Sequence, residues 1–237
     1  MESSRYVNGA YAGSNPDWHD DDAGWKASRI ASFVRDSGAA PSTLCDIGCG
    51  TGGVLSHLAK QLPDVVAVGY DVSPQAVEMA ARLHPGVDVR LGDAVESGKV
   101  YDLAMLIDVF EHVEDYMGFL RRVSVVGRQF LFHIPLDMNV VDVWREHRLK
   151  AKRDDVGHLH YFSKLTALET LRDTGYRIDA TRYTTVGVDA VARHYKQRLL
   201  QQAMRVGYRV APDSAARILG GGSLLVLATP ARADSPS

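Results

Sequence analysis

This chain of 237 residues has few cysteines, only a small excess of acidic over basic residues, and no long apolar run. The two cysteines, Cys45 and Cys49, are too few for a disulfide framework and are typical of a reducing compartment. The 27 basic and 29 acidic residues leave a formal charge of −2, which gives no overall field to attract nucleic acid or an anionic membrane. Apolar runs are too short to cross a bilayer, and the first residues do not resemble a signal peptide. We therefore expect a cytoplasmic protein with no nucleic-acid partner and no membrane insertion.

Short apolar runs that alternate with amphipathic segments fill most of the chain. Runs typical of buried strands occupy 43–47, 65–70, 87–91, 103–107 and 129–134, and residues at helical spacing lie between them. Further strands are expected at 177–186 and 223–229. Strands that are apolar throughout and separated by helices indicate a parallel sheet that is covered on both faces. The sequence therefore predicts an α/β fold.

The expected organisation has one main domain with appendages. Residues 1–40 should form an irregular, aromatic-rich arm and a helix from about Asp22, which together act as a lid. The main domain should span 41–230, with a basic helical insertion at about 189–210. Residues 231–237 should be a disordered tail.

The most informative segment is LCDIGCGTGG at 44–53, directly after one expected strand and before a helix. Glycines let the backbone approach a ligand closely, and the helix N-terminus offers N–H groups to an anion. Asp46 precedes this turn, and Asp71 closes the next strand, where a carboxylate can accept hydrogen bonds from ribose hydroxyls. A nucleotide-like ligand is thus predicted. The run fits the G-x-G-x-x-G pattern of nicotinamide sites poorly, although a nicotinamide-dependent oxidoreductase stays an alternative.

DIGCGTGG, with GYDVSPQAVEMA, LGDAVE and YDLAMLIDVFEHVED, resembles the class I S-adenosylmethionine-dependent methyltransferases over about residues 40–185. The resemblance implies S-adenosyl-L-methionine as cofactor. It also implies a seven-stranded, mostly parallel Rossmann-like sheet with an antiparallel last strand and helices on both faces. The segment Asp108–Glu111 departs from the N/D-P-P-Y/F tetrad of DNA and protein-glutamine N-methyltransferases. The small-molecule branch of the superfamily is the better match.

The resemblance also assigns cofactor contacts to residues at or just beyond strand ends. In this assignment the glycine turn holds the methionine end, Asp71 binds the ribose, and Asp93 binds the exocyclic amine of adenine. Asp108 lines the methyl-transfer position. The full set of expected cofactor residues is Asp46, Gly48, Cys49, Gly50, Asp71, Val72, Asp93, Ala94, Asp108 and Val109.

Three histidines, His112, His133 and His158, fall at or beyond strand ends and are the candidate general bases. His158 and His160 lie one residue apart without an obvious third ligand, so no metal is expected. The predicted reaction is in-line methyl transfer to an O, N or C atom of a sugar, quinone or other metabolite, by a monomer or homodimer. A non-catalytic module that binds S-adenosylmethionine is the second alternative.

Overall fold

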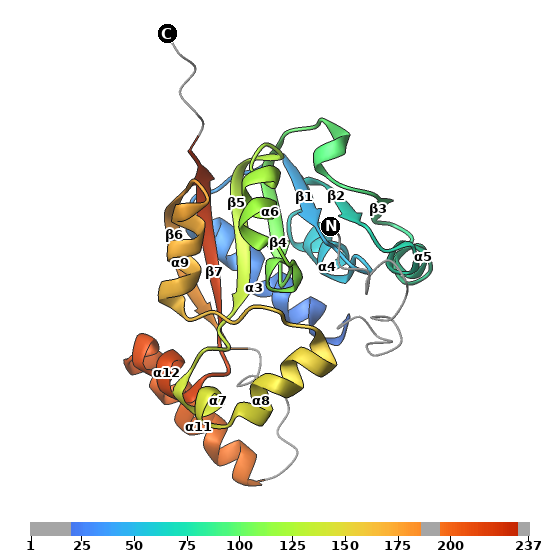
Figure 1. The fold of residues 1–237 in the computed structure, drawn as a ribbon. Helices are drawn as coiled ribbons and strands as arrows, with labels where there is room; N and C mark the ends of the chain where they lie inside the picture. Colours follow the sequence, from blue (N-terminus) through green and yellow to red (C-terminus); the bar gives the residue numbers. More distant parts are fainter. Residues whose placement is uncertain (1–19, 186–194, 232–237) are drawn as a thin grey trace.

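The computed structural model describes residues 20–185 and 195–231, and seven strands of these residues form one sheet (Figure 1). The strand order is β3-β2-β1-β4-β5-β7-β6. Five strands run parallel: β1 (Thr43–Ile47), β2 (Val66–Asp71), β3 (Asp88–Leu91), β4 (Tyr101–Ile107) and β5 (Gly127–Pro135). The last strand, β7 (Ser223–Pro230), is antiparallel to both β5 and β6 (Tyr176–Thr184). The predicted sheet is confirmed, including its antiparallel last strand.

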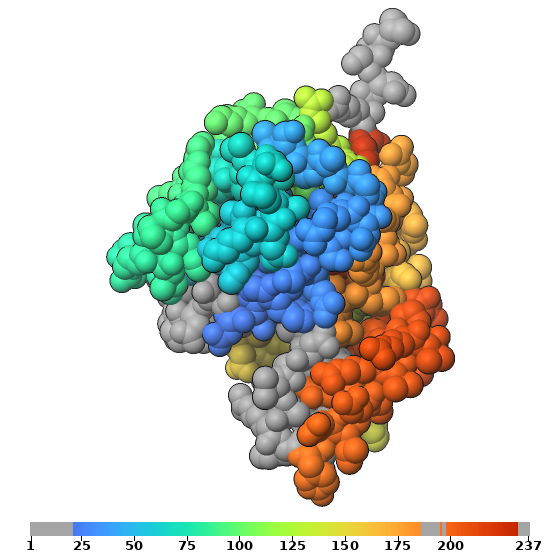
Figure 2. Space-filling model, turned by 180° about the vertical axis from the view of Figure 1, so that it is seen from behind, coloured from blue at the N-terminus to red at the C-terminus, as the bar shows by residue number. Residues whose placement is uncertain are grey.

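Helices cover both faces of this sheet. On one face, α3 (Ala23–Asp36) and α4 (Gly53–Gln61) lie side by side, as Figure 2 shows from behind. On the other face lie α6 (Tyr116–Val123) and α9 (Lys164–Asp173), while α5 (Pro74–Leu83) connects β2 to β3 (Figure 1). Because side chains alternate along a strand, β4 sends Leu103 and Met105 toward α3 and α4, and Ala104 and Leu106 toward the other core.

A layer of further helices lies beyond the carboxyl ends of the parallel strands (Figure 1). It contains α7 (Val140–Trp144), α8 (Glu146–Ala151), a π-helical turn η4 (Lys152–Val156), α11 (Tyr195–Val210) and α12 (Pro212–Leu219). Of these, only α11 corresponds to a predicted element, the insertion expected at about 189–210. Residues 186–194, the arm at 1–19 and most of the tail lie outside the described residues. No helix in the described ranges is both long enough and apolar enough to span a membrane.

Serine or glycine residues stand at the beginnings of three of the helices. The Ser73 hydroxyl accepts a hydrogen bond from the Ala76 N–H and begins α5, as expected for a serine before proline. Ser163 caps α9 in the same way. Thr51 lies just before α4 but does not cap it, because α4 begins after Gly52, which has a φ of 76°. The chain thus enters α4 through a left-handed glycine and not through a side-chain cap.

Candidate active site

A cavity of roughly 650 Å³ lies at the carboxyl ends of β1, β2, β4 and β5. The structure brings to its wall all of the predicted cofactor residues and the three predicted histidines, which come from segments between Asp46 and His158. The sheet order explains this grouping, because β1 and β4 are neighbours at the centre, flanked by β2 and β5. Ligands of open α/β sheets bind at this edge.

The glycine turn between β1 and α4 approaches the cavity with its backbone. Gly48 and Gly50 have φ values of 74° and 55°, in the left-handed region that side chains disfavour. The Gly48 N–H donates to the Tyr70 carbonyl at 2.8 Å, which ties the turn to the end of β2. A Cβ added at Gly48 would lie 3.0 Å from Val109 Cγ2. Glycine is therefore required here both by the dihedral angle and by the close approach of Val109.

Two buried carboxylates flank this turn and differ in their hydrogen bonds. Asp71 accepts hydrogen bonds from the Gly50 N–H and the Ser73 N–H, each at 2.8 Å, and so fixes the turn against β2. Asp46 is buried, and its Oδ1 has no hydrogen-bond partner among the described residues. Burial, reinforced by the charge of Asp71, raises the pKa of Asp46 to about 8. A buried carboxylate oxygen without a partner beside a glycine turn fits an ammonium group of a ligand.

The end of the cavity beyond β3 is lined by Asp93 and Ala94, the residues predicted to contact adenine. The backbone N–H of Val95 donates to Asp93 Oδ1 at 2.9 Å, which fixes the short η2 turn (Val95–Ser97). Asp93 Oδ2 also forms an ion pair with Arg122 of α6. If Asp93 binds the exocyclic amine of adenine as predicted, its carboxylate must contact that amine and Arg122 at the same time. Ala94 is buried and lines the cavity next to it.

Asp108, directly after β4, has a strained backbone and a carboxylate with two partners. Its φ of 54° places a non-glycine residue in the left-handed region, a strain of about 1–2 kcal/mol. Its carboxylate lies 2.6 Å from His133 Nδ1 and 3.0 Å from Lys26 Nζ. Burial alone would raise the pKa of Asp108, but His133 and Lys26 outweigh it and lower the pKa below its usual value. Asp108 therefore stays ionised.

His133 completes this arrangement from β5. It is 2% exposed, and its Nε2 lies 2.9 Å from the Thr184 hydroxyl while Nδ1 faces Asp108. Both ring nitrogens are therefore engaged. A role as general base, which stays a prediction, requires the hydrogen bond to Thr184 to break first. In this conformation the ring orients Asp108 instead.

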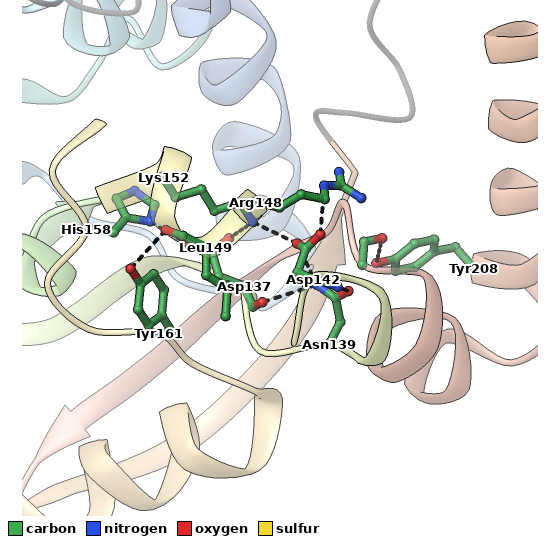
Figure 3. A network of polar contacts seen from close by, with 10 residues as sticks. Asp137, Asn139, Asp142, Arg148, Leu149, Lys152, His158, Tyr161 and Tyr208 are labelled. Atoms are coloured by element: carbon green, nitrogen blue, oxygen red, sulfur yellow. Dashed lines mark hydrogen bonds and ion pairs between the residues drawn. The ribbon is translucent and has the colours of Figure 1, made fainter. Parts of the chain in front are cut away.

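His158 belongs to a second polar network that joins β5 to the helical layer (Figure 3). Its Nδ1 lies 2.6 Å from Asp137 Oδ2, and the other oxygen of Asp137 pairs with Lys152 at 2.5 Å. Although burial would raise it, the pKa of Asp137 is lowered by His158 and Lys152. Asp142 pairs with Lys152 and Arg148, and the side chain of Asn139 caps α7. The segment 135–139 thus anchors α7 and η4 to the end of β5.

Comparison with known proteins decides the family, since a model described as a methyltransferase domain matches residues 18–181. The chain belongs to this family. Norajmaline N-methyltransferase of Rauvolfia serpentina is 33% identical over 111 residues, covering 43% of this chain and 38% of that protein. A dTDP-3-amino-3,4,6-trideoxy-alpha-D-glucopyranose N,N-dimethyltransferase of Streptomyces venezuelae is 28% identical over 123 residues, covering 50% and 49%. The chain thus spans half or less of the length of these curated relatives.

A solved structure agrees at the level of the fold. The magnesium protoporphyrin IX methyltransferase of Synechocystis PCC 6803, in complex with S-adenosylhomocysteine, aligns with a TM-score of 0.57 at 16% identity. The alignment covers 88% of this chain and 83% of that one. Together with the family model, this confirms the methyltransferase resemblance and the Rossmann-like sheet.

Three polar residues of this methyltransferase domain were given no role from the sequence. A role for Lys26 could have been predicted from the sequence, because Lys26 lies on the buried stripe of α3 with Ala23, Ala27 and Ile30. A lysine on such a stripe needs a partner, and Asp108 supplies it. Thr184 ends β6 and gives no comparable signal. Glu111 stands in the FEHVED run but received no separate role, although the structure buries it completely.

Proposed function

We propose that this chain is an S-adenosylmethionine-dependent methyltransferase for a small-molecule acceptor, with nitrogen as the favoured nucleophile. The observation that carries the proposal is the partnerless Asp46 oxygen beside the glycine turn, in a family of methyltransferase domains. When bound, the cofactor supplies a sulfonium methyl group with a good leaving thioether. The contribution of the protein is then mainly to align the acceptor with that methyl group.

The cofactor end of the cavity offers a complementary partner for each part of S-adenosylmethionine. Asp46 would receive the methionine ammonium, and the left-handed glycines let the backbone approach the methionine end. Asp71 can accept both ribose hydroxyls without losing Gly50 and Ser73, because each carboxylate oxygen has two lone pairs and each accepts one hydrogen bond in the structure. Val72, Asp93 and Ala94 would surround the adenine.

The acceptor end of the cavity lies past Asp108, where Val113, Val156 and Ser223 also line the wall. Asp108 is ionised but is already paired with Lys26 and His133, so its charge gives no preference for a cationic acceptor. Both curated relatives described above carry N-methyltransferase names, which supports nitrogen as the nucleophile. A neutral amine needs no base to attack, whereas a hydroxyl would need one of the three histidines to take its proton.

The test is a turnover assay with the full chain. We expect S-adenosylhomocysteine and a singly methylated product, detected by mass spectrometry, when a panel of amines, amino sugars and hydroxylated metabolites is supplied with S-adenosylmethionine. The Asp71→Ala variant provides the control for cofactor-dependent turnover. Cofactor binding without turnover on any acceptor would favour the non-catalytic module. A thermal shift with a nicotinamide dinucleotide, and none with S-adenosylhomocysteine, would overturn the proposal.

A further inference from the structure

Glu111, His112 and His158 form a cluster beside the cavity, and their grouping is not required by cofactor binding or by methyl transfer to an amine. Each side chain offers one ligand atom, and these atoms all lie within 4.8 Å of one another. The two rings meet edge to face, with centroids 4.9 Å apart. Glu111 and His112 come from the η3 turn (Phe110–His112) after β4, whereas His158 comes from the segment after η4. The fold therefore places Glu111 and His112 beside His158 as two further candidate ligands.

The carboxylate of this cluster lacks a partner. Glu111 is 0% exposed, and neither Oε1 nor Oε2 has a hydrogen-bond partner among the described residues. A buried carboxyl group without hydrogen bonds is costly, and native structures normally supply a donor or a cation. Burial, together with the negative charges of Asp108 and Asp137, raises the pKa of Glu111 well above its usual value. The same surroundings would stabilise a cation placed beside it.

Both imidazoles are held in the way that metal-binding histidines are held. His158 Nδ1 lies 2.6 Å from the Asp137 carboxylate, and His112 Nδ1 lies 3.1 Å from the Gly157 carbonyl (Figure 3 shows His158 and Asp137). A ring that donates from Nδ1 to a carboxylate or a carbonyl carries its lone pair on Nε2. Metal-ligating histidines characteristically donate their other N–H to such groups. Each ring therefore has an orienting acceptor as well as a ligand nitrogen.

The two segments that carry the cluster are also fixed to each other. The backbone N–H groups of Leu159 and His160 both donate to the Glu111 carbonyl, at 2.9 and 3.1 Å. The His160 ring contacts the Val113 carbonyl at 3.0 Å. Gly157, with a φ of 90°, turns the chain between η4 and His158. The cluster is thus preorganised by backbone contacts before any ion arrives.

We propose that Glu111, His112 and His158 bind one divalent first-row transition-metal ion at the acceptor end of the cavity. Two imidazoles and one carboxylate suit Zn²⁺, Fe²⁺ or Mn²⁺ and leave coordination positions open. His112 and His158 line the cavity, so those positions face it. An acceptor with an oxygen donor beside its nucleophile, such as an amino alcohol, could be oriented by the ion. The metal site goes beyond the proposed function and does not depend on it.

The test uses Co²⁺ as a spectroscopic probe on the untagged full chain, with neither cofactor nor acceptor present. We expect one Co²⁺ per chain, with visible d–d absorption that is lost on titration with Zn²⁺. Glu111→Gln and His158→Ala should each weaken Co²⁺ binding at least about tenfold, and Asp137→Asn about 10- to 100-fold, since it removes the orienting carboxylate. Glu111→Gln should still fold, because it removes an unpaired buried carboxylate and keeps the volume.

His160→Ala is the matched control, since His160 lies in the same segment but its ring contacts the Val113 carbonyl and lies outside the cluster. This variant should retain the wild-type spectrum and stoichiometry. The proposal is overturned if the wild type takes up no stoichiometric Co²⁺, if Glu111→Gln and His158→Ala bind like the wild type, or if charge-transfer bands reveal thiolate ligands. Binding of S-adenosylhomocysteine by the same samples reports separately on the proposed function.

Discussion

The protonation of Asp46 should make cofactor affinity depend on pH in a defined way. Burial and the nearby Asp71 raise the pKa of Asp46 to about 8, so this carboxyl is mostly neutral at pH 6 and half ionised at pH 8. Binding an ammonium group requires the ionised form, and each pH unit below 8 therefore weakens binding up to about tenfold, or about 1.4 kcal/mol. The α-amino group of the ligand lies beside its own ionised α-carboxylate, so it stays protonated at pH 8. Affinity should therefore rise from pH 6 to pH 8 and level off above the pKa of Asp46.

S-adenosylhomocysteine is the suitable ligand, because it carries the same amino group and is not consumed. Isothermal titration calorimetry should show affinity rising roughly 50-fold from pH 6 to pH 8, as the ionised fraction of Asp46 rises from about 1% to about half. Titrations at pH 6.5 in buffers of different ionisation enthalpy should show about one proton released per ligand bound, as linkage requires. Asp46→Asn should bind more weakly at pH 8 and lose the rise in affinity. Asp93→Asn, at the adenine end, should keep the rise. A flat profile in the wild type, or the same rise in Asp46→Asn, would refute the assignment of Asp46 to the ammonium.

Four further predictions concern stability, binding and turnover. Since the folded-state pKa of Asp46 is raised, the unliganded protein should lose stability as pH rises from about 4 to 8. Asp46→Asn should therefore have a higher melting temperature than the wild type at pH 8, and a smaller advantage at pH 5. The same difference in melting temperature at both pH values would contradict the raised pKa. Asp71→Ala should weaken S-adenosylhomocysteine binding by ~1–3 kcal/mol in calorimetry, and unaltered binding would remove Asp71 from the ribose. Gly48→Ala should combine left-handed strain of about 1–2 kcal/mol with the contact to Val109, and a melting temperature and affinity like the wild type would show that the turn tolerates a side chain. His133→Ala should remove the contact that orients Asp108, and should lower turnover up to about 100-fold and affinity for S-adenosylhomocysteine by less. Lost affinity with unchanged turnover per bound enzyme would exclude this role.

The sequence predicts the sheet well because parallel buried strands leave a strong local signal. β1, β2, β4 and β5 each contain a mostly apolar run, whereas β3 is an exposed edge strand that includes Asp88 and Arg90. The observed strand ends differ from the expected ones by no more than two residues. Apart from α11, the helical layer left no such signal. Segment 140–156 is mostly exposed and charged, and it is held by ion pairs such as that of Lys152 with Asp137, 15 positions apart. Long-range pairing of this kind is invisible to local periodicity.

The candidate site likewise contains some residues that the local sequence could place and others that it could not. Residues that belong to a strand end or a glycine turn could be placed from the sequence, because the parallel topology brings those points together. The partners of those residues could not. Lys26 reaches Asp108 from a helix 82 positions earlier in the sequence, and Thr184 reaches His133 from the edge strand β6. Whether a carboxylate is paired or left without a partner is decided by such contacts, and the chemistry of the cavity depends on that difference.

Three carboxylates in or beside this cavity differ in whether they have partners, and the difference indicates where cations bind. Asp108 is compensated within the protein, since Lys26 and His133 both contact it and lower its pKa. Asp46 and Glu111 are buried with oxygens that have no partner among the described residues, and the pKa of each is raised. A protein of marginal stability gains nothing from burying such groups unless a ligand supplies the missing positive charge. Two uncompensated carboxylates, one beside the glycine turn and one beside two oriented imidazoles, therefore imply two separate cationic occupants. The ammonium of the cofactor suits Asp46, and a divalent metal ion suits Glu111.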